Sequence, residues 1–242
     1  MKKVGILYVC TGRYAAFWNP FYHASEELFL PEVEKHYFIF TDNSGLLQLK
    51  DERIHPVFQE VEPWPFPTLR RFGYFLKAAD VLRQMDYLMF MNANLLVQKK
   101  IGAEEILPEG DEKLFVTLHP GFFDKTPRDF TYDRNPECSA CVQQGGGMYY
   151  FAGGFNGGCT ENFLELAACL SQRTEADYAR GVIALWHDES HLNRYMIEYP
   201  GKFRILSPAY LYPQGWKLPF EKRILVLDKN RKGGHSFLRS ES

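Results

Sequence analysis

Residues 87–100 read YLMFMNANLLVQKK, an apolar run that ends at two asparagines flanking an alanine. The uninterrupted apolar segment Tyr87–Met91 is typical of a β-strand that is buried on both faces. Asn92 and Asn94 then place two polar amides directly at the strand end. From this stretch alone they could form a turn, a metal site that has lost its charges, or a ligand site that needs no metal.

Apolar runs and helical patterns alternate on both sides of this segment. The pattern predicts strands at Val4–Cys10 and Tyr37–Phe40, a helix within Asn19–Leu30, and a helix from a Thr68 N-cap to about Met85. This alternation predicts a single-domain α/β protein with a doubly wound sheet. Ligands of such sheets bind beyond the carboxyl ends of the strands, which is where Asn92 and Asn94 lie.

The second half of the chain is less regular. We expect strands at Leu114–Leu118, Met148–Ala152 and Ile224–Leu227, loops over 119–147, and helices at Glu161–Ser171, Glu175–Leu185 and Ser190–Ile197. The glycine-rich segment GGFNGG (153–158) is predicted to be a tight turn, or a place where a ligand lies against the backbone. The tail, about 228–242, is basic and contains glycine, so it is expected to be mobile without a ligand.

Composition excludes several classes of protein. The chain has 242 residues with 45% hydrophobic and 16% aromatic content, which argues against disorder. Its net charge of −2 argues against a nucleic-acid partner. No apolar stretch approaches the roughly 18 residues of a membrane span. The five cysteines are scattered among apolar residues, which suits a reducing compartment, so a cytoplasmic location is expected.

The segment WHDESHLNRY (186–195) is the most informative motif. Asp188 and Glu189 could simply favour the N-terminus of a helix. Alternatively, one carboxylate could stabilise or attack an oxocarbenium-like sugar carbon while Trp186 packs against the sugar. A glycosidase is a poor alternative, because adjacent residues rarely place two carboxyl groups ~5–9 Å apart across one glycosidic bond.

Two loop segments and a cysteine pair complete the candidates. TLHPGFF (117–123) and FTYDRNP (130–136) supply aromatic, imidazole and hydroxyl groups that suit a polyol. Cys138 and Cys141 form a CxxC pair, but no second CxxC or paired histidines follow at a suitable spacing. We therefore expect these two cysteines to be free thiols and expect no zinc site.

Several stretches together resemble glycosyltransferase family 6, the family of the histo-blood-group A and B transferases and α1,3-galactosyltransferase. TGRY, YFIFTD, TLRRF, YLMFMNAN, TLHPGFF, FTYDRNP, YYFAGGFNGG, WHDESHLNRY and LSPAYL occur in the family's order, over roughly residues 4–232. The resemblance implies a GT-A fold, with a Rossmann-like mixed sheet flanked by helices. It also implies a retaining transfer of galactose or N-acetylgalactosamine (GalNAc) from UDP to form an α1,3 linkage. Without the vertebrate transmembrane stem, the chain is similar to the soluble bacterial members.

The resemblance also assigns roles to individual residues. Glu189 would lie beneath the anomeric carbon, either as a covalent nucleophile or as a stabiliser of a front-face ion-pair transition state. The residues implied to bind the donor are Val9, Tyr14, Arg71, Asn92, Asn94, Ala152, Gly153, Gly154, Asp188, Lys229 and Arg231. Those implied to contact the acceptor are His119, Thr131, Trp186 and Glu189.

Donor and acceptor preferences follow from the same resemblance. Ala152-Gly153-Gly154 matches the family's donor-selecting triplet, and glycine at its third place leaves room for an acetamido group. UDP-GalNAc is therefore expected rather than UDP-galactose, although Ala152 is smaller than the family's usual first residue. The expected acceptor is a fucosylated galactose, while Pro213 departs from the acidic residue that the blood-group enzymes carry after this motif.

The Asn-Ala-Asn segment stands where vertebrate members carry an Asp-x-Asp that binds Mn²⁺. Two neutral amides are poor ligands for that ion, so we expect no metal and no cofactor apart from the UDP-sugar co-substrate. Asn92 would bind the donor and Asn94 would serve orientation. Lys229 and Arg231 of the tail, with Lys232 and Arg239 nearby, would offset charge on the leaving diphosphate. The alternative is an inactive sugar- or nucleotide-binding protein of the same fold.

Overall fold

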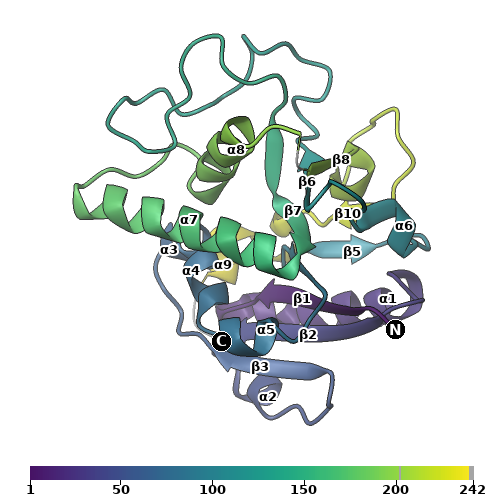
Figure 1. Cartoon of the computed structure of the whole chain (residues 1–242). Helices are drawn as coiled ribbons and strands as arrows, with labels where there is room; N and C mark the ends of the chain where they lie inside the picture. Colours follow the sequence, from purple (N-terminus) through teal and green to yellow (C-terminus); the bar gives the residue numbers. More distant parts are fainter. Residues whose placement is uncertain (202, 240–242) are drawn as a thin grey trace.

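Seven strands form the central sheet of the computed structural model, which describes residues 1–201 and 203–239 (Figure 1). Their order is β3 (Ile54–Phe58), β2 (Glu34–Thr41), β1 (Lys3–Val9), β4 (Tyr87–Met91), β7 (Phe151–Cys159), β6 (Leu114–Leu118) and β8 (Phe203–Leu206). The first four strands are parallel, β7 runs antiparallel to both of its neighbours, and β8 is parallel to β6. This mixed sheet with flanking helices confirms the predicted α/β class and the GT-A type of fold.

Both faces of the sheet are buried, which explains the continuous apolar runs in the sequence. Ile6 and Tyr8 of β1 pack on the side of α1 (Trp18–Leu28). Leu7, between them, faces the opposite layer, which contains α4 (Arg71–Leu76), α7 (Thr160–Ala179) and α8 (Asp188–Glu198). The same alternation holds in β2 and β4, so the parallel strands lie between two apolar layers.

The predicted helix from Thr68 to Met85 is wrong in its continuity. The chain forms three short helices instead, α3 (Phe66–Leu69), α4 and α5 (Ala79–Leu82), and Thr68 lies inside α3 rather than capping a helix. The breaks fall at Arg70 and Ala78, whose φ angles of −102° and −109° leave the helical range. Packing of the aromatic side chains of α4 against the sheet overrides the periodicity that suggested one long helix.

Of the two alternatives for the glycine-rich segment GGFNGG, the tight turn is wrong, because the segment is part of strand β7. A Cβ atom on Gly157 would lie 2.5 Å from the carbonyl oxygen of Leu88, and one on Gly158 would lie 2.2 Å from that of Lys113. Only glycine therefore permits the neighbouring strands to approach β7 this closely. The expected strand at Met148–Ala152 correspondingly begins later, at Phe151.

The remaining elements surround the candidate site. The two helices predicted around 161–185 are one helix, α7, and α8 begins at Asp188, two residues before the predicted start. Residues 119–147, all of them described, contain no helix or strand, as expected. A small second sheet joins β5 (Leu95–Val97), β10 (Ile224–Val226) and β9 (Tyr212–Pro213). The short segments α2 (Ser44–Leu47), α6 (Ala103–Ile106), η1 (Gly12–Phe17) and η2 (Pro208–Leu211) connect the larger elements.

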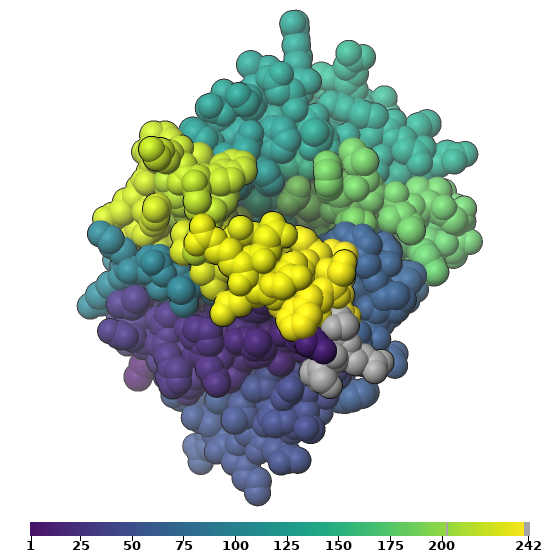
Figure 2. Space-filling view, turned by 180° about the vertical axis from the view of Figure 1, so that it is seen from behind, coloured from purple at the N-terminus to yellow at the C-terminus, as the bar shows by residue number. Residues whose placement is uncertain are grey.

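The C-terminal segment folds back over the molecule. It forms η3 (Lys229–Lys232) and α9 (Gly234–Leu238), and Figure 2 shows this yellow segment lying across one face beside the purple N-terminal residues. Residues 240–242 of the predicted tail lie outside the described residues. None of the helices in the described part of the chain has the length and apolar character needed to span a membrane.

Candidate active site

A cavity of about 300 Å³ opens beyond the carboxyl ends of β1 and β4. Residues far apart in the sequence line it, from the first strand to the C-terminal segment. Of the residues predicted from the sequence, those that line the cavity are Val9, Tyr14, Arg71, Asn92, Gly153, Gly154, Trp186, Asp188, Glu189 and Lys229. Those that do not line it are Asn94, Ala152, His119, Thr131 and Arg231.

Glu189, in the first turn of α8, has its carboxylate fixed by two hydrogen bonds. The Tyr150 hydroxyl donates to Oε1 at 3.1 Å, and the Gly153 amide donates to Oε2 at 2.9 Å. Burial raises the pKa of Glu189 to about 7, and the neighbouring Asp188 charge adds to the rise, while the two hydrogen bonds oppose it. The site therefore holds a pre-oriented carboxylate whose ionisation lies close to neutral pH.

Asp188 forms a buried ion pair with Arg71. Its Oδ2 lies 3.2 Å from Arg71 Nε, and neither atom has a hydrogen-bond partner among the described residues. Burial raises the pKa of Asp188 to about 6, with Arg71 acting in the opposite direction. The Arg71 guanidinium also lies over the ring of Phe90, 4.3 Å from its centre. Two buried polar atoms with unused hydrogen-bonding capacity beside a cavity suit a polyhydroxylated ligand.

The turn that presents these two carboxylates is strained, a feature that sequence reasoning missed. His187 has φ +55° and ψ −125°, a conformation that non-glycine residues rarely adopt. The turn is held by the Ser190 hydroxyl, which accepts from the Trp186 amide at 2.9 Å, and by Trp64, whose ring packs edge-to-face with that of His187 at 4.9 Å between ring centres. Surrounding contacts therefore maintain the backbone that directs Asp188 and Glu189 towards the cavity.

Of the residues predicted to contact an acceptor, Trp186 and Glu189 line the cavity, whereas Thr131 and His119 do not. The indole N–H of Trp186 donates to Thr131 Oγ1 at 3.0 Å, and the Trp186 side chain remains 47% exposed. His119 packs against the Tyr150 ring, with 5.7 Å between ring centres, and Tyr150 in turn holds Glu189. Burial lowers the pKa of His119 to about 4, so its imidazole is neutral at physiological pH. Thr131 is therefore linked to the cavity through Trp186, and His119 is linked to it through Tyr150 and Glu189.

Asn92 and Asn94 have different surroundings. Asn92 lines the cavity, whereas Asn94 is buried and its Oδ1 accepts from Asn92 Nδ2 at 3.1 Å. The Asn94 amide donates to the Leu227 carbonyl at 2.7 Å, and the Leu227 N–H donates to the Asn94 carbonyl at 2.8 Å. Asn94 therefore connects the end of β4 to the chain just before the C-terminal segment.

This pair of amides does not fit a divalent cation such as Mn²⁺. Neither side chain carries a formal charge, and the Asn94 oxygen already accepts a hydrogen bond from Asn92. Across residues 1–201 and 203–239, the one group of three histidine, cysteine or carboxylate ligands close enough to share an ion is Cys138, Asp177 and His191, away from the cavity. At the end of β4 the two side chains instead form hydrogen bonds, from Asn92 to Asn94 and from Asn94 to the Leu227 carbonyl.

The C-terminal segment brings cations to the cavity. Lys229 Nζ lies 5.3 Å from the centre of the Tyr14 ring, and the Arg239 guanidinium lies 3.7 Å from that of Trp64. Burial, together with the nearby charges of Arg71 and Arg239, lowers the pKa of Lys229 to about 8. Arg231 is exposed, lies 4.0 Å from Asp228 and does not line the cavity. Arg239, which the sequence placed only near the site, lines it instead.

A mixed sheet of the GT-A type, with a polar cleft at its strand ends where carboxylates lie beside cations, is the arrangement expected of glycosyltransferases that use nucleotide-sugar donors. Comparison with known sequences then places the chain within that class. The sequence model of Glycosyltransferase family 6 matches residues 2–240, and the chain belongs to this family.

Similar proteins come from both bacteria and vertebrates. The chain is 33% identical over 229 residues to the O-antigen biosynthesis glycosyltransferase WbnI of Escherichia coli. The alignment covers 95% of this chain and 96% of that protein. It is 30% identical over 238 residues to the globoside alpha-1,3-N-acetylgalactosaminyltransferase 1 of Gallus gallus, in an alignment that covers 94% of this chain and 67% of that protein. It is 28% identical over 244 residues to the histo-blood group ABO system transferase 1 of Rattus norvegicus, in an alignment that covers 95% of this chain and 67% of that protein.

Proposed function

We propose that this chain is a retaining α1,3-glycosyltransferase that moves GalNAc from UDP-GalNAc to the galactose of a fucosylated oligosaccharide without a divalent metal ion. The observation that carries the proposal is the Glu189 carboxylate, held by Tyr150 and Gly153 at the cavity beside the buried Asp188–Arg71 pair. The name of the globoside relative, an alpha-1,3-N-acetylgalactosaminyltransferase, supports the linkage and the GalNAc donor.

In this proposal the bond between the anomeric carbon and the diphosphate oxygen breaks, and Glu189 faces the positive charge that develops on the sugar. Either Glu189 forms a transient bond to that carbon, or it stabilises an ion pair until the acceptor hydroxyl attacks. As the new glycosidic bond forms, any bond to Glu189 breaks and the hydroxyl proton passes to an oxygen of the departing UDP diphosphate. Asp188 and Arg71 would position donor-sugar hydroxyls, since both have buried polar atoms available for further hydrogen bonds.

The diphosphate leaving group gains negative charge as this bond breaks. Lys229 and Arg239 of the C-terminal segment, together with Arg71, are the cations that line the cavity and would offset this charge. Asparagines at the end of β4 leave the phosphates free of the repulsion that two aspartates would add. Protein cations would therefore take the role that a metal ion has in relatives with an Asp-x-Asp.

The decisive experiment is a donor-by-acceptor assay with and without EDTA. We expect UDP release from UDP-GalNAc with a fucosyl-galactose acceptor, at a rate that the chelator leaves unchanged. Activity that disappears with EDTA and returns with Mn²⁺ would show that the reaction needs metal. Tight binding of UDP-sugars without turnover of any donor would favour the alternative, an inactive binding protein.

Gly154→Ala is expected to shift donor preference from UDP-GalNAc towards UDP-galactose by roughly tenfold or more, because one added methyl group would occupy space needed by the acetamido group. A Cβ atom there would lie 3.4 Å from Leu211 and 3.9 Å from Asn92, which are ordinary contacts, so the protein itself accommodates alanine. The measurement is kcat/KM for both donors. Retained turnover of UDP-galactose is the internal control, and an unchanged donor ratio would refute the assignment.

The transfer rate is expected to fall as the pH drops below about 7, because Glu189 takes up a proton below its pKa and loses the charge that the reaction uses. Tyr150→Phe removes a hydrogen bond to the ionised carboxylate, which raises the Glu189 pKa further. The acidic limb of the kcat/KM profile should therefore move to higher pH.

Tyr132→Phe is the matched control, because it also removes a partly buried tyrosine hydroxyl in the same aromatic cluster. The Tyr132 hydroxyl donates to the Tyr149 carbonyl rather than to Glu189. The acidic limb of the kcat/KM profile of Tyr132→Phe should therefore stay at the wild-type pH. Identical profiles for both variants would show that Tyr150 does not tune Glu189.

A further inference from the structure

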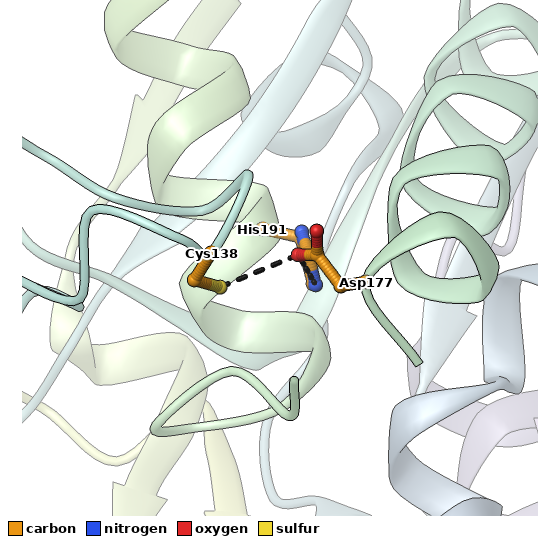
Figure 3. A group of neighbouring side chains, drawn as sticks. All are labelled: Cys138, Asp177 and His191. Atoms are coloured by element: carbon orange, nitrogen blue, oxygen red, sulfur yellow. Dashed lines mark hydrogen bonds and ion pairs between the residues drawn. The ribbon is translucent and has the colours of Figure 1, made fainter. Parts of the chain in front are cut away.

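Three ligand-type side chains meet outside the candidate active site, where distant parts of the chain converge (Figure 3). Cys138 comes from the long connection 119–147, Asp177 from the last turn of α7, and His191 from the first turn of α8. One ligand atom from each lies within 4.8 Å of the other two. All three residues are buried, with exposed fractions of 3%, 1% and 0%, and none of them lines the cavity.

His191 has the least satisfied environment of the three. Both of its ring nitrogens are buried and lack a hydrogen-bond partner among the described residues. Nε2 lies 3.9 Å from Asp177 Oδ2, too far for a hydrogen bond. Burial lowers the pKa of His191 to about 4, so the ring is neutral at physiological pH and one nitrogen carries a free lone pair. A buried polar group left unpaired is costly, and an ion or a water at this position would remove that cost.

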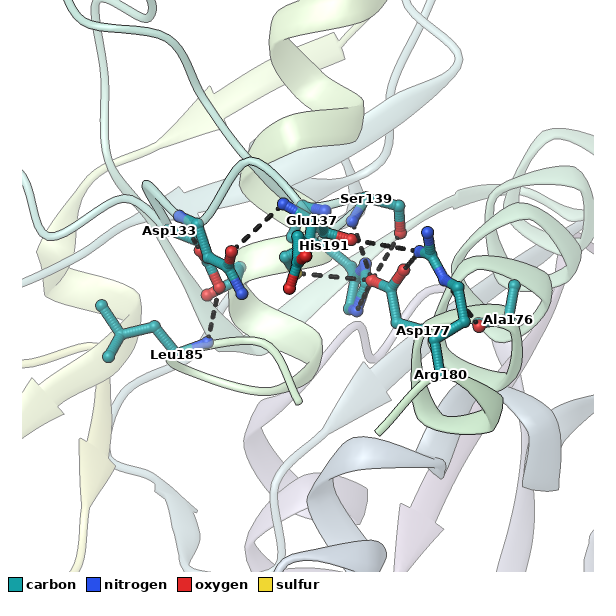
Figure 4. Close-up of polar contacts among 12 residues, drawn as sticks. Asp133, Glu137, Ser139, Ala176, Asp177, Arg180, Leu185 and His191 are labelled. Carbon is teal, nitrogen blue, oxygen red and sulfur yellow. Dashed lines mark hydrogen bonds and ion pairs between the residues drawn. The ribbon is translucent and has the colours of Figure 1, made fainter. Parts of the chain in front are cut away.

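Asp177 is held firmly in place by surrounding donors, as Figure 4 shows. Arg180 pairs with Oδ1, and Ser139 donates to Oδ2 through its amide at 2.8 Å and its hydroxyl at 2.7 Å. The Cys138 thiol donates to the same oxygen, with 3.4 Å between sulfur and oxygen. Outer hydrogen bonds of this kind orient carboxylates that ligate metal ions, and here they keep Oδ2 beside the Cys138 sulfur.

We propose that Cys138, Asp177 and His191 bind a zinc ion that joins the 119–147 connection to α7 and α8. A thiolate, a carboxylate and a neutral imidazole form a donor set that suits Zn²⁺, with a water at the fourth position. Binding releases the thiol proton to solvent, and the ion then has two negative ligands, the Cys138 thiolate and the Asp177 carboxylate that also pairs with Arg180. The ion would fasten α8 two residues beyond Glu189. This site is separate from the cavity, so the proposal does not depend on how the transfer reaction proceeds.

The cysteine spacing had argued against zinc because Cys138 and Cys141 lack a second pair. In the structure Cys141 takes no part in the cluster, and the other two ligands come from α7 and α8. Cys141 is therefore a natural control: it lies three residues from Cys138, is more exposed, and its sulfur accepts a long contact of 3.8 Å from Gln143.

The test measures metal content and spectroscopic signature in the full chain. Protein purified without chelator and incubated with Zn²⁺ should retain about one zinc per chain after gel filtration. Cobalt-substituted protein should show a thiolate-to-cobalt charge-transfer band. Cys138→Ser should lose both, whereas Cys141→Ser should keep both.

The wild-type measurements decide the outcome even if Cys138→Ser fails to fold. Wild-type protein that retains less than about 0.1 zinc per chain and shows no charge-transfer band with cobalt would overturn the site, leaving a hydrogen-bonded network. Zinc retention that is the same in folded Cys138→Ser would also overturn it. Neither readout uses transferase activity, so failure of this proposal is distinguishable from failure of the proposed function.

Discussion

Replacing Glu189 with glutamine is expected to lower kcat at least ~100-fold, a loss of about 2.7 kcal/mol of transition-state stabilisation. Glutamine keeps the size of the side chain and can still accept from the Gly153 amide, but it has no charge to place opposite the sugar carbon. The measurement is kcat with saturating UDP-GalNAc and acceptor, together with the melting temperature.

Stability separates this effect from damage to the fold. Because the Glu189 pKa is raised, the folded protein disfavours the ionised carboxylate at neutral pH relative to the unfolded chain. A neutral glutamine is therefore expected to leave the melting temperature unchanged or to raise it. Glu198→Gln is the matched control, since Glu198 lies at the exposed far end of the same helix, where it pairs with Arg173 and Arg194. A rate within about twofold of wild type for Glu189→Gln would remove this residue from its proposed role.

Replacing Lys229 with methionine is expected to lower kcat/KM for the donor roughly 10- to 100-fold. Lys229 lies at the cavity beside Tyr14, where its charge would face the leaving diphosphate. The loss is limited because Arg71 and Arg239 would still stabilise part of the diphosphate charge. Lys232→Met is the matched control, because Lys232 belongs to the same short helix but is exposed and does not line the cavity. Its kcat/KM should stay within about twofold of wild type. Equal losses in the two variants would point to a general charge effect.

The pH dependence of UDP binding gives a second readout for Lys229. Its pKa is lowered to about 8 in the free protein, and a bound diphosphate would raise that pKa by favouring the protonated amine. Binding then takes up a proton, so UDP affinity should fall as the pH rises above about 8. Calorimetric titration of the wild type and of Lys229→Met at several pH values would measure this. In Lys229→Met the UDP affinity should not fall above this pH. If it still falls, the titrating group is a residue other than Lys229.

Local sequence patterns predicted the strands of the sheet well. The runs at Val4–Cys10, Tyr37–Phe40 and Tyr87–Met91 are apolar because the strands are covered on both faces, and that property is visible residue by residue. The tight-turn alternative for GGFNGG was wrong because nothing local distinguishes a glycine needed for a positive φ from one needed for a close approach of neighbouring strands. Gly157 is of the second kind, and its constraint comes from β4, distant in the sequence.

The candidate site divides in the same way. The resemblance named Asp188, Glu189 and Arg71, and the structure brings these three together at one cavity. It could not distinguish Arg231 from Arg239, because both are basic residues of one short tail and only the path of η3 and α9 decides which reaches Trp64. Asn94 likewise looked equivalent to Asn92, yet its amide is bonded to Leu227 in a segment that the sequence places far away.

The amino-acid sequence by itself determined the alternation of strands and helices, the position of the Asn-Ala-Asn segment at a strand end, and the order of the motifs that mark the family. These features depend on neighbouring residues, so a single chain displays them directly. Only the tertiary structure decided which tail cation lines the cavity, that Asn94 holds the C-terminal segment, and that Cys138, Asp177 and His191 share one buried point. The physical reason is that these arrangements join residues from separate elements, and only the packing of the elements around the sheet brings them within bonding distance.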